Sequence, residues 1–120
     1  MNEDERSPMV VAEFPEFAKE ADRLLGERAL QRLIEFLGLN PLAGVIVPDC
    51  AGVRKLRWAI PGRGKRGGAR VIYYFHDETL PLLALRLYAK NEKADITAED
   101  RKQIKAQVRE YIRFHKGKKR

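Results

Sequence analysis

Residues 53–72 read VRKLRWAIPGRGKRGGARVI, and this stretch decides most of the predicted fold. Two runs rich in apolar and β-branched residues, RKLRWA and ARVIYYF, flank a Gly-rich basic loop. The pattern predicts two β-strands, at about residues 53–59 and 69–75. Basic residues recur along the whole stretch without any acidic residue among them. Cations fixed on strands suit a protein that holds a phosphate chain in one place.

A third strand is predicted at residues 80–89, after a short polar turn, so that it forms an antiparallel hairpin with residues 69–75. A fourth short strand is predicted upstream, at residues 9–14 (MVVAEF). Two short helices joined at Gly26 follow it and are typical of a helical hairpin.

Residues 38–52 are rich in Gly and Pro and predict a loop, with a brief extended piece at 45–47. The last helix is predicted to begin near Thr97, which forms a capping box with Asp100. The residues that this helix is expected to bury are Ile104, Val108, Tyr111 and Ile112.

These elements predict an α+β fold, in which a small antiparallel-rich sheet packs on an N-terminal helical hairpin and is followed by a C-terminal helix. The length of 120 residues fits one domain. We expect the domain to span residues 1–115 and residues 116–120 to form a disordered basic tail.

Side chains of a strand alternate between the two faces of a sheet, which predicts one apolar and one cationic face. The apolar face would pack on the helices. Tyrosines between the cations suit either cross-strand packing or stacking on bases. The apolar set is Leu56, Trp58, Val71, Tyr73, Phe75, Leu83, Leu85 and Leu87. The opposite set is Lys55, Arg57, Arg70, Ile72, Tyr74, Arg86, Tyr88 and Lys90.

Composition narrows the class of protein. With 44% hydrophobic and 34% charged residues, the chain is typical of a globular protein. Its net charge of +7 favours a polyanionic partner, which could be nucleic acid, an anionic membrane or an acidic protein. The single Cys50 excludes an internal disulfide and a cysteine-based metal cage. The chain has no apolar run long enough to span a bilayer and no signal-peptide pattern, so we expect it in the cytoplasm.

The loop GRGKRG at residues 62–67 matches the pattern GxGxxG, but a dinucleotide-binding fold requires a helix after it and here a strand follows. Two interpretations remain. The loop is either a hairpin connection with solvated charges, or a clamp whose Lys65 and Arg66 close over a phosphodiester backbone. His76 lies in a turn and His115 in a basic segment, so neither is placed as a catalytic base. Asp95 is interpreted as an ordinary acidic residue before a helix.

Three segments carry a resemblance to a known family: PMVVAEFPEFAKEADRLL, RKLRWAIPGRGKRGGARVIYYF and LYAKNEKADIT. The chain resembles the RelE/HigB toxins of bacterial type II toxin–antitoxin systems, in particular the HigB-like branch. The second segment is the most specific. The resemblance implies a RelE-like fold and a metal-independent mRNA interferase without a cofactor. Such a toxin cuts mRNA in the ribosomal A site and is neutralised by a cognate helix-turn-helix antitoxin.

The resemblance also implies roles for individual residues. Arg57 and Arg70 would hold the scissile phosphate while the 2′-hydroxyl attacks it, and Lys55 and Lys90 would handle proton transfer. RelE itself has an Arg and then a Tyr after its last strand, which this chain lacks. The residues expected to contact flanking RNA or the ribosome are Lys65, Arg66, Arg86, Tyr88 and Lys93.

Two other functions of related or similar proteins remain open. ParE-like proteins share the fold and poison DNA gyrase, and a noncatalytic module would bind RNA or DNA without cutting it. Operator DNA would be contacted only through the complex with the antitoxin. The convergence of cations on one strand face, rather than along a helix, favours the interferase.

Overall fold

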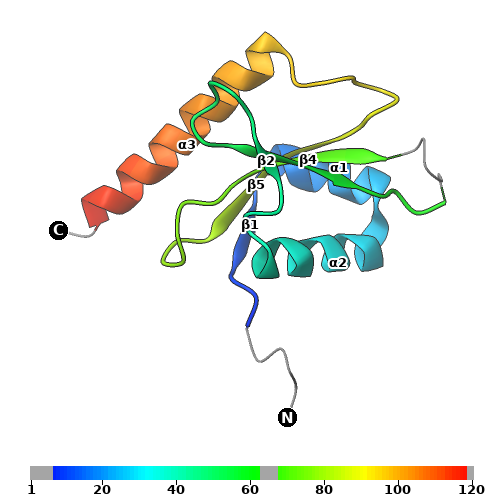
Figure 1. The fold of residues 1–120 in the computed structure, drawn as a ribbon, viewed down its shortest axis with the longest axis horizontal. Helices are drawn as coiled ribbons and strands as arrows, with labels where there is room; N and C mark the ends of the chain where they lie inside the picture. Colours follow the sequence, from blue (N-terminus) through cyan, green and yellow to red (C-terminus); the bar gives the residue numbers. More distant parts are fainter. Residues whose placement is uncertain (1–6, 63–67, 119–120) are drawn as a thin grey trace.

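A computed structural model describes residues 7–62 and 68–118, and it contains one five-stranded sheet in the order β1-β5-β4-β3-β2 (Figure 1). β1 pairs in parallel with β5, and all other neighbours are antiparallel. The fold is the predicted α+β arrangement. The elements are β1 Val11–Glu13, α1 Pro15–Leu24, α2 Gly26–Leu39, β2 Val45–Ile46, β3 Arg54–Trp58, β4 Ala69–Tyr74, β5 Leu82–Ala89 and α3 Ala98–Lys118.

The helical hairpin is confirmed, and it covers one face of the sheet. Gly26 adopts a φ of 78° at the start of α2, in the left-handed region that glycine enters without strain, which allows the chain to reverse direction there. Phe17 on α1 and Leu33 on α2 are fully buried. They join a cluster that includes Val71 and Leu87 of the central strands. Burial of these apolar side chains holds the hairpin against the sheet.

The prediction that Leu83, Leu85 and Leu87 share a face is wrong. In the pairing of β4 with β5, Ile72 lies opposite Arg86 whereas Tyr73 lies opposite Ala84, so Leu85 is an extra residue in a β-bulge. The bulge reverses the alternation. Leu83 and Leu85 therefore belong to a second core on the other face, while Leu87 packs under α1 and α2.

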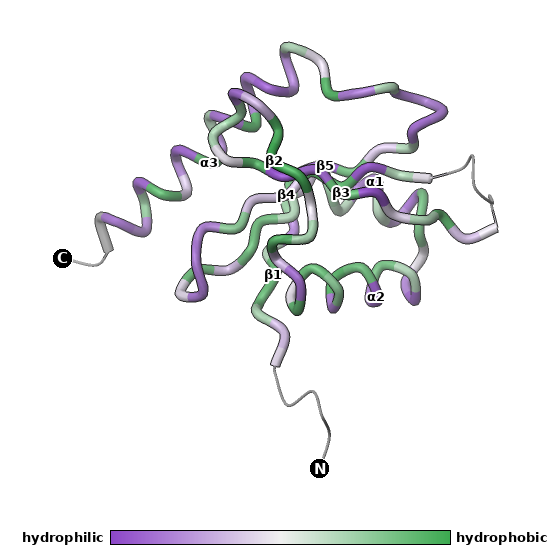
Figure 2. Tube along the Cα trace, viewed as in Figure 1, coloured by the Kyte–Doolittle hydropathy of each residue, from purple (hydrophilic) through white to green (hydrophobic). Residues whose placement is uncertain are grey.

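The second core lies under α3, so helices cover both faces of the sheet. Ile104 and Val108 of α3 are fully buried in it, and Tyr111 and Ile112 are partly buried, as expected. Figure 2 shows hydrophilic and hydrophobic residues alternating along α3, as expected of a helix with one buried side. None of the helices in the described residues is long and apolar enough to cross a membrane.

The capping box at the start of α3 is confirmed. The Thr97 N–H donates to Asp100 Oδ2 at 2.8 Å, and the Asp100 N–H donates to Thr97 Oγ1 at 3.0 Å. The other end of α3 differs from the prediction. The helix continues to Lys118, so residues 116–118 are helical rather than part of a disordered tail. Apolar anchoring at Tyr111 and Ile112 extends the helix beyond the point where the sequence becomes basic.

Candidate active site on the open end of the sheet

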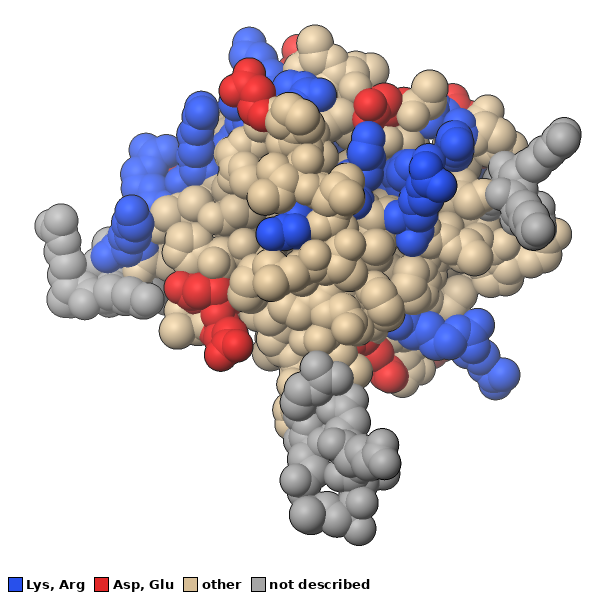
Figure 3. Space-filling model, in the orientation of Figure 1, with Lys and Arg blue, Asp and Glu red and all other residues tan. Residues whose placement is uncertain are grey.

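The candidate site is centred on a row of side chains that crosses three strands. Arg57 of β3 lies directly opposite Arg70 of β4, and Arg70 lies directly opposite Tyr88 of β5. Directly opposed residues of neighbouring strands point to the same face. Two like charges in such a pair destabilise a sheet, unless an anion binds between them. Figure 3 shows basic side chains (blue) gathered over this end of the sheet.

Two hollows flank this arginine pair, and both have Arg57 and Arg70 in their walls. The first, of about 410 Å³, is also lined by Lys55, and the second, of about 250 Å³, is also lined by Lys90. We call these two hollows together the cationic cleft. The structure thus brings together the four side chains for which the family resemblance implies catalytic roles.

The loop before β2 and β2 itself form a further wall of the cleft, to which they contribute Ala43 and Val45. Tyr73 ties this loop to β4, because its hydroxyl donates to Pro41 O at 2.8 Å and accepts from the Gly44 N–H at 2.8 Å. A Cβ at Gly44 would lie 2.8 Å from the Tyr73 ring. Glycine is therefore required for this close approach.

Asp95, which sequence analysis had interpreted as an ordinary acid, places a carboxylate beside Lys55 of the cleft. Its Oδ1 lies 3.5 Å from Lys55 Nζ and accepts hydrogen bonds from the Tyr88 hydroxyl at 3.3 Å and the Ile96 N–H at 2.8 Å. The hydrogen bond from Ile96 is the main cause that lowers the pKa of Asp95; burial opposes it, and Lys55 and Tyr88 add to it. No local sequence pattern predicts this contact, because Lys55 and Asp95 are far apart in the chain and meet only when the segment between β5 and α3 folds over the sheet.

Tyr88 contributes its hydroxyl rather than its ring to this site. The residue is only 6% exposed, and its ring packs in the core under α3, which favours cross-strand packing over stacking on bases. Burial, followed by the nearby Asp95 charge, raises the pKa of Tyr88 to about 12. The hydroxyl therefore stays protonated at neutral pH. Lys93 Nζ lies 5.8 Å from the centre of the ring and pairs with Asp100.

Arg86, which we expected on the open cationic face, lies outside the cationic cleft because α3 covers it. Its side chain is only 11% exposed and lies 3.6 Å from Glu16 of α1. Its Nη1 donates to Leu85 O at 2.8 Å and to Gln107 Oε1 of α3 at 3.0 Å. Arg86 thus connects the two helices instead of facing solvent. Lys65 and Arg66, the predicted clamp, lie outside the described residues.

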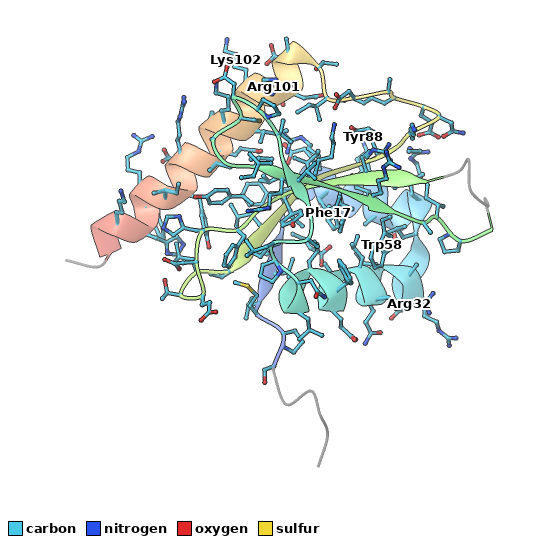
Figure 4. All side chains as sticks on the ribbon, viewed as in Figure 1. Phe17, Arg32, Trp58, Tyr88, Arg101 and Lys102 are labelled. Atoms are coloured by element: carbon cyan, nitrogen blue, oxygen red, sulfur yellow. The ribbon has the colours of Figure 1, made fainter. Side chains whose placement is uncertain are left out.

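Among the residues that the structure describes, no group of three or more His, Cys, Asp and Glu side chains is arranged to hold a metal ion. Trp58 packs on the face covered by the helical hairpin of α1 and α2, as predicted, and the centre of its ring lies 5.3 Å from that of Phe36 on α2 (Figure 4). His76 bonds to the Tyr74 hydroxyl at 2.9 Å, and His115 packs against Tyr111.

A five-stranded sheet with an N-terminal helical hairpin, a C-terminal helix and a basic cleft at its open end defines a class of small α+β proteins suited to binding a polyanion. Residues 44–118 match the family described as the RelE toxin of the RelE/RelB toxin–antitoxin system. The chain therefore belongs to the RelE toxin family, which confirms the resemblance at the level of this family. The family makes it a toxin whose partner is a cognate antitoxin.

Proposed function

We propose that this toxin is a ribosome-dependent mRNA endoribonuclease that cleaves mRNA in the A site by attack of the 2′-hydroxyl on the adjacent phosphate. The observation that carries the proposal is the cross-strand pair of Arg57 and Arg70, shared by both hollows of the cationic cleft. Because RNA supplies its own nucleophile, the protein has only to orient it, transfer protons and stabilise negative charge.

The two arginines would hold the scissile phosphate, since a guanidinium matches two phosphate oxygens at once. Negative charge develops on those oxygens in the transition state. Removal of one preorganised donor of this kind typically costs about 3–4 kcal/mol, or 10²–10³ in kcat. The arginine pair is therefore the group whose loss should affect the rate most.

Lys55 and Lys90 lie in the two different hollows, on either side of the arginine pair. This arrangement suits one group that takes the proton of the 2′-hydroxyl and another that gives a proton to the leaving 5′-oxygen. The ion pair with Asp95 would keep Lys55 Nζ in position at the cleft wall. Tyr88, protonated at neutral pH, would act only as a hydrogen-bond donor.

Arg70→Ala should reduce cleavage by about 10²–10³-fold and leave the fold intact, because Arg70 is partly exposed and supplies charge to the wall of the cleft. The measurement is to add purified protein to a translation reaction and map the mRNA 5′ ends. Arg32→Ala is the matched control, since Arg32 is an exposed arginine on α2, which covers the face of the sheet opposite to that of Arg70 (Figure 4).

Undiminished cutting by a folded Arg70→Ala protein would overturn the assignment of the site. DNA damage in place of mRNA cuts would instead identify a gyrase poison. Binding of RNA without any cut ends would identify a noncatalytic module.

A further inference from the structure

A second basic surface lies on α3 and shares no residue with the cationic cleft. At 3.6 residues per turn, its cations fall within an arc of about 120° and extend over about 22 Å of the helix. The acidic residues of α3 lie outside this arc. We call this surface the α3 stripe; it consists of Arg101, Lys102, Lys105, Arg109, Arg113 and Lys116.

The α3 stripe is arranged at a cost to helix stability. Arg101, Lys105, Arg109 and Arg113 follow one another at intervals of four residues, and each like-charged pair at this spacing destabilises a helix by about 0.2–0.5 kcal/mol. Neighbouring acids do little to relieve this repulsion. Arg113 pairs with Glu110 at 2.6 Å, but no ion pair within the described part of the chain reaches Lys102, Lys105 or Arg109.

The surface is accessible and shaped to receive an extended ligand. Lys102 and Arg109 are exposed, and Lys105 is partly exposed. These three side chains, with Arg101, line a shallow hollow of about 450 Å³. Figure 4 shows Arg101 and Lys102 at the first turns of α3, and Figure 3 shows the basic side chains of α3 on the same face of the molecule as those of the cleft.

The chemistry of the hollow favours a phosphate chain over a protein. The apolar lining of this hollow consists of Ala98 and Ala106 alone, so this half of the stripe offers no pocket for the large apolar side chains that anchor protein partners; the half at Arg109 and Arg113 borders a separate apolar groove lined by Phe14, Tyr111 and Phe114. Lysines and arginines in a row along a straight helix suit the regularly spaced phosphates of a nucleic acid backbone. Such contacts carry no sequence information and position the protein instead.

We propose that the α3 stripe binds the backbone of double-helical RNA, independently of sequence, while the cationic cleft engages a single strand. A-form RNA is recognised mostly through its shape and phosphates, which a basic helix face can contact without reading bases. The identification of that duplex as ribosomal RNA rests on the proposed function. The affinity of the α3 stripe for duplex RNA is independent of the proposed function.

The direct test measures binding to a blunt 20-base-pair RNA duplex over a range of KCl concentrations. Arg70→Ala protein is compared with the same protein carrying Lys102→Gln, Lys105→Gln and Arg109→Gln. Each lost phosphate contact should lower the slope of log K against log[KCl] by about 1, so we expect a decrease of about 2–3 and a loss of affinity of more than tenfold at low salt.

The matched control carries Lys19→Gln, Arg28→Gln and Arg32→Gln, which remove the same charge from exposed positions on α1 and α2. The control should keep nearly the original slope and affinity. Equal losses in the two triple variants would mean that net charge alone attracts the RNA, and the proposal would fail. It would also fail if the α3 variant bound duplex normally and lost affinity for the antitoxin instead.

A second measurement separates the stripe from the proposed function. With Arg70 present, the α3 variant should pellet less with ribosomes and need at least tenfold more protein for half-maximal mRNA cleavage, at unchanged cut positions. Cleavage at the original potency would overturn the identification of the duplex as ribosomal RNA. If the unmodified toxin binds duplex RNA through the α3 stripe but never cuts mRNA, the proposed function is wrong and the assignment of the stripe as an RNA-binding surface is retained.

Discussion

At the scale of single residues, Asp95 connects Lys55 of the cationic cleft to Tyr88 of β5. Its carboxylate is the only acidic group that the described residues pair with Lys55, and it also accepts a hydrogen bond from the Tyr88 hydroxyl. A carboxylate beside the proposed phosphate site would repel the substrate, so we expect Asp95 to have a compensating role. Its contact with Lys55 supplies one, since a flexible lysine side chain loses precision without a partner.

Asp95→Asn should therefore separate positioning from binding. Asparagine keeps an oxygen for the Ile96 N–H and the Tyr88 hydroxyl but loses the charge that holds Lys55. We expect kcat for mRNA cleavage to fall about tenfold, which corresponds to about 1.4 kcal/mol, while KM stays the same or falls because a negative charge leaves the cleft. Single-turnover cleavage on programmed ribosomes measures both. An unchanged kcat would show that Asp95 does not position Lys55.

At the scale of elements, the connection between the loop before β2 and the sheet shapes the cleft. β2 is only two residues long and pairs with β3, so strand pairing alone anchors the loop weakly. The buried Tyr73 hydroxyl bonds to both ends of the turn, at Pro41 and Gly44. One side chain of β4 thus positions the wall that faces Lys55 and Arg57.

Tyr73→Phe should lower the free energy of unfolding by about 1–3 kcal/mol, because it leaves the Gly44 N–H and the Pro41 carbonyl without their buried partner. Urea denaturation followed by circular dichroism measures the change. Tyr111→Phe is the matched control: its hydroxyl makes one bond, to Pro81 O at 3.2 Å, in a partly buried position. We expect a loss of at most about 1 kcal/mol there. Equal losses would contradict the anchoring role of Tyr73.

At the scale of the whole molecule, the carboxylates near the junction between β5 and α3 make the stability of the fold depend on pH. Asp95 lies in this junction, and Asp100 lies in the first turn of α3. Burial alone would raise the pKa of Asp100, but hydrogen bonds from Lys93 and Thr97 outweigh burial and lower it. The pKa of Asp95 is also lowered. Both carboxylates therefore favour the folded state when they are ionised.

The sign of this linkage predicts acid destabilisation. A carboxyl group whose folded pKa is lowered contributes stability above its unfolded pKa of about 3.9 and loses that contribution as the pH falls through the folded pKa. The thermal midpoint should therefore decrease below about pH 4. The double variant Asp95→Asn/Asp100→Asn should be less stable at neutral pH and show a smaller decrease in acid, as measured by calorimetry from pH 7 to pH 2.5. If the thermal midpoints of the unmodified protein and the double variant decreased equally in acid, Asp95 and Asp100 would not be the source of the acid destabilisation.

Much of the molecule could be predicted from local pattern. The capping box of Thr97 and Asp100, the helical hairpin and the strands that carry Arg57 and Arg70 all formed where periodicity and turn residues placed them. Each of these features depends on residues a few positions apart, whose backbone preferences act whatever the rest of the chain does. The sequence by itself determined the elements and the placement of the two arginines on one face of the sheet; their direct pairing across β3 and β4 is a finding of the structure.

Only the tertiary structure decided which parts of the sheet remain open. β5 is apolar towards both of its faces because helices cover both, so alternation could not reveal the bulge at Leu85. The docking of α3 then buried Arg86 and brought Asp95 to Lys55. These outcomes depend on contacts between residues far apart in the chain, and such contacts have no local signature in the sequence.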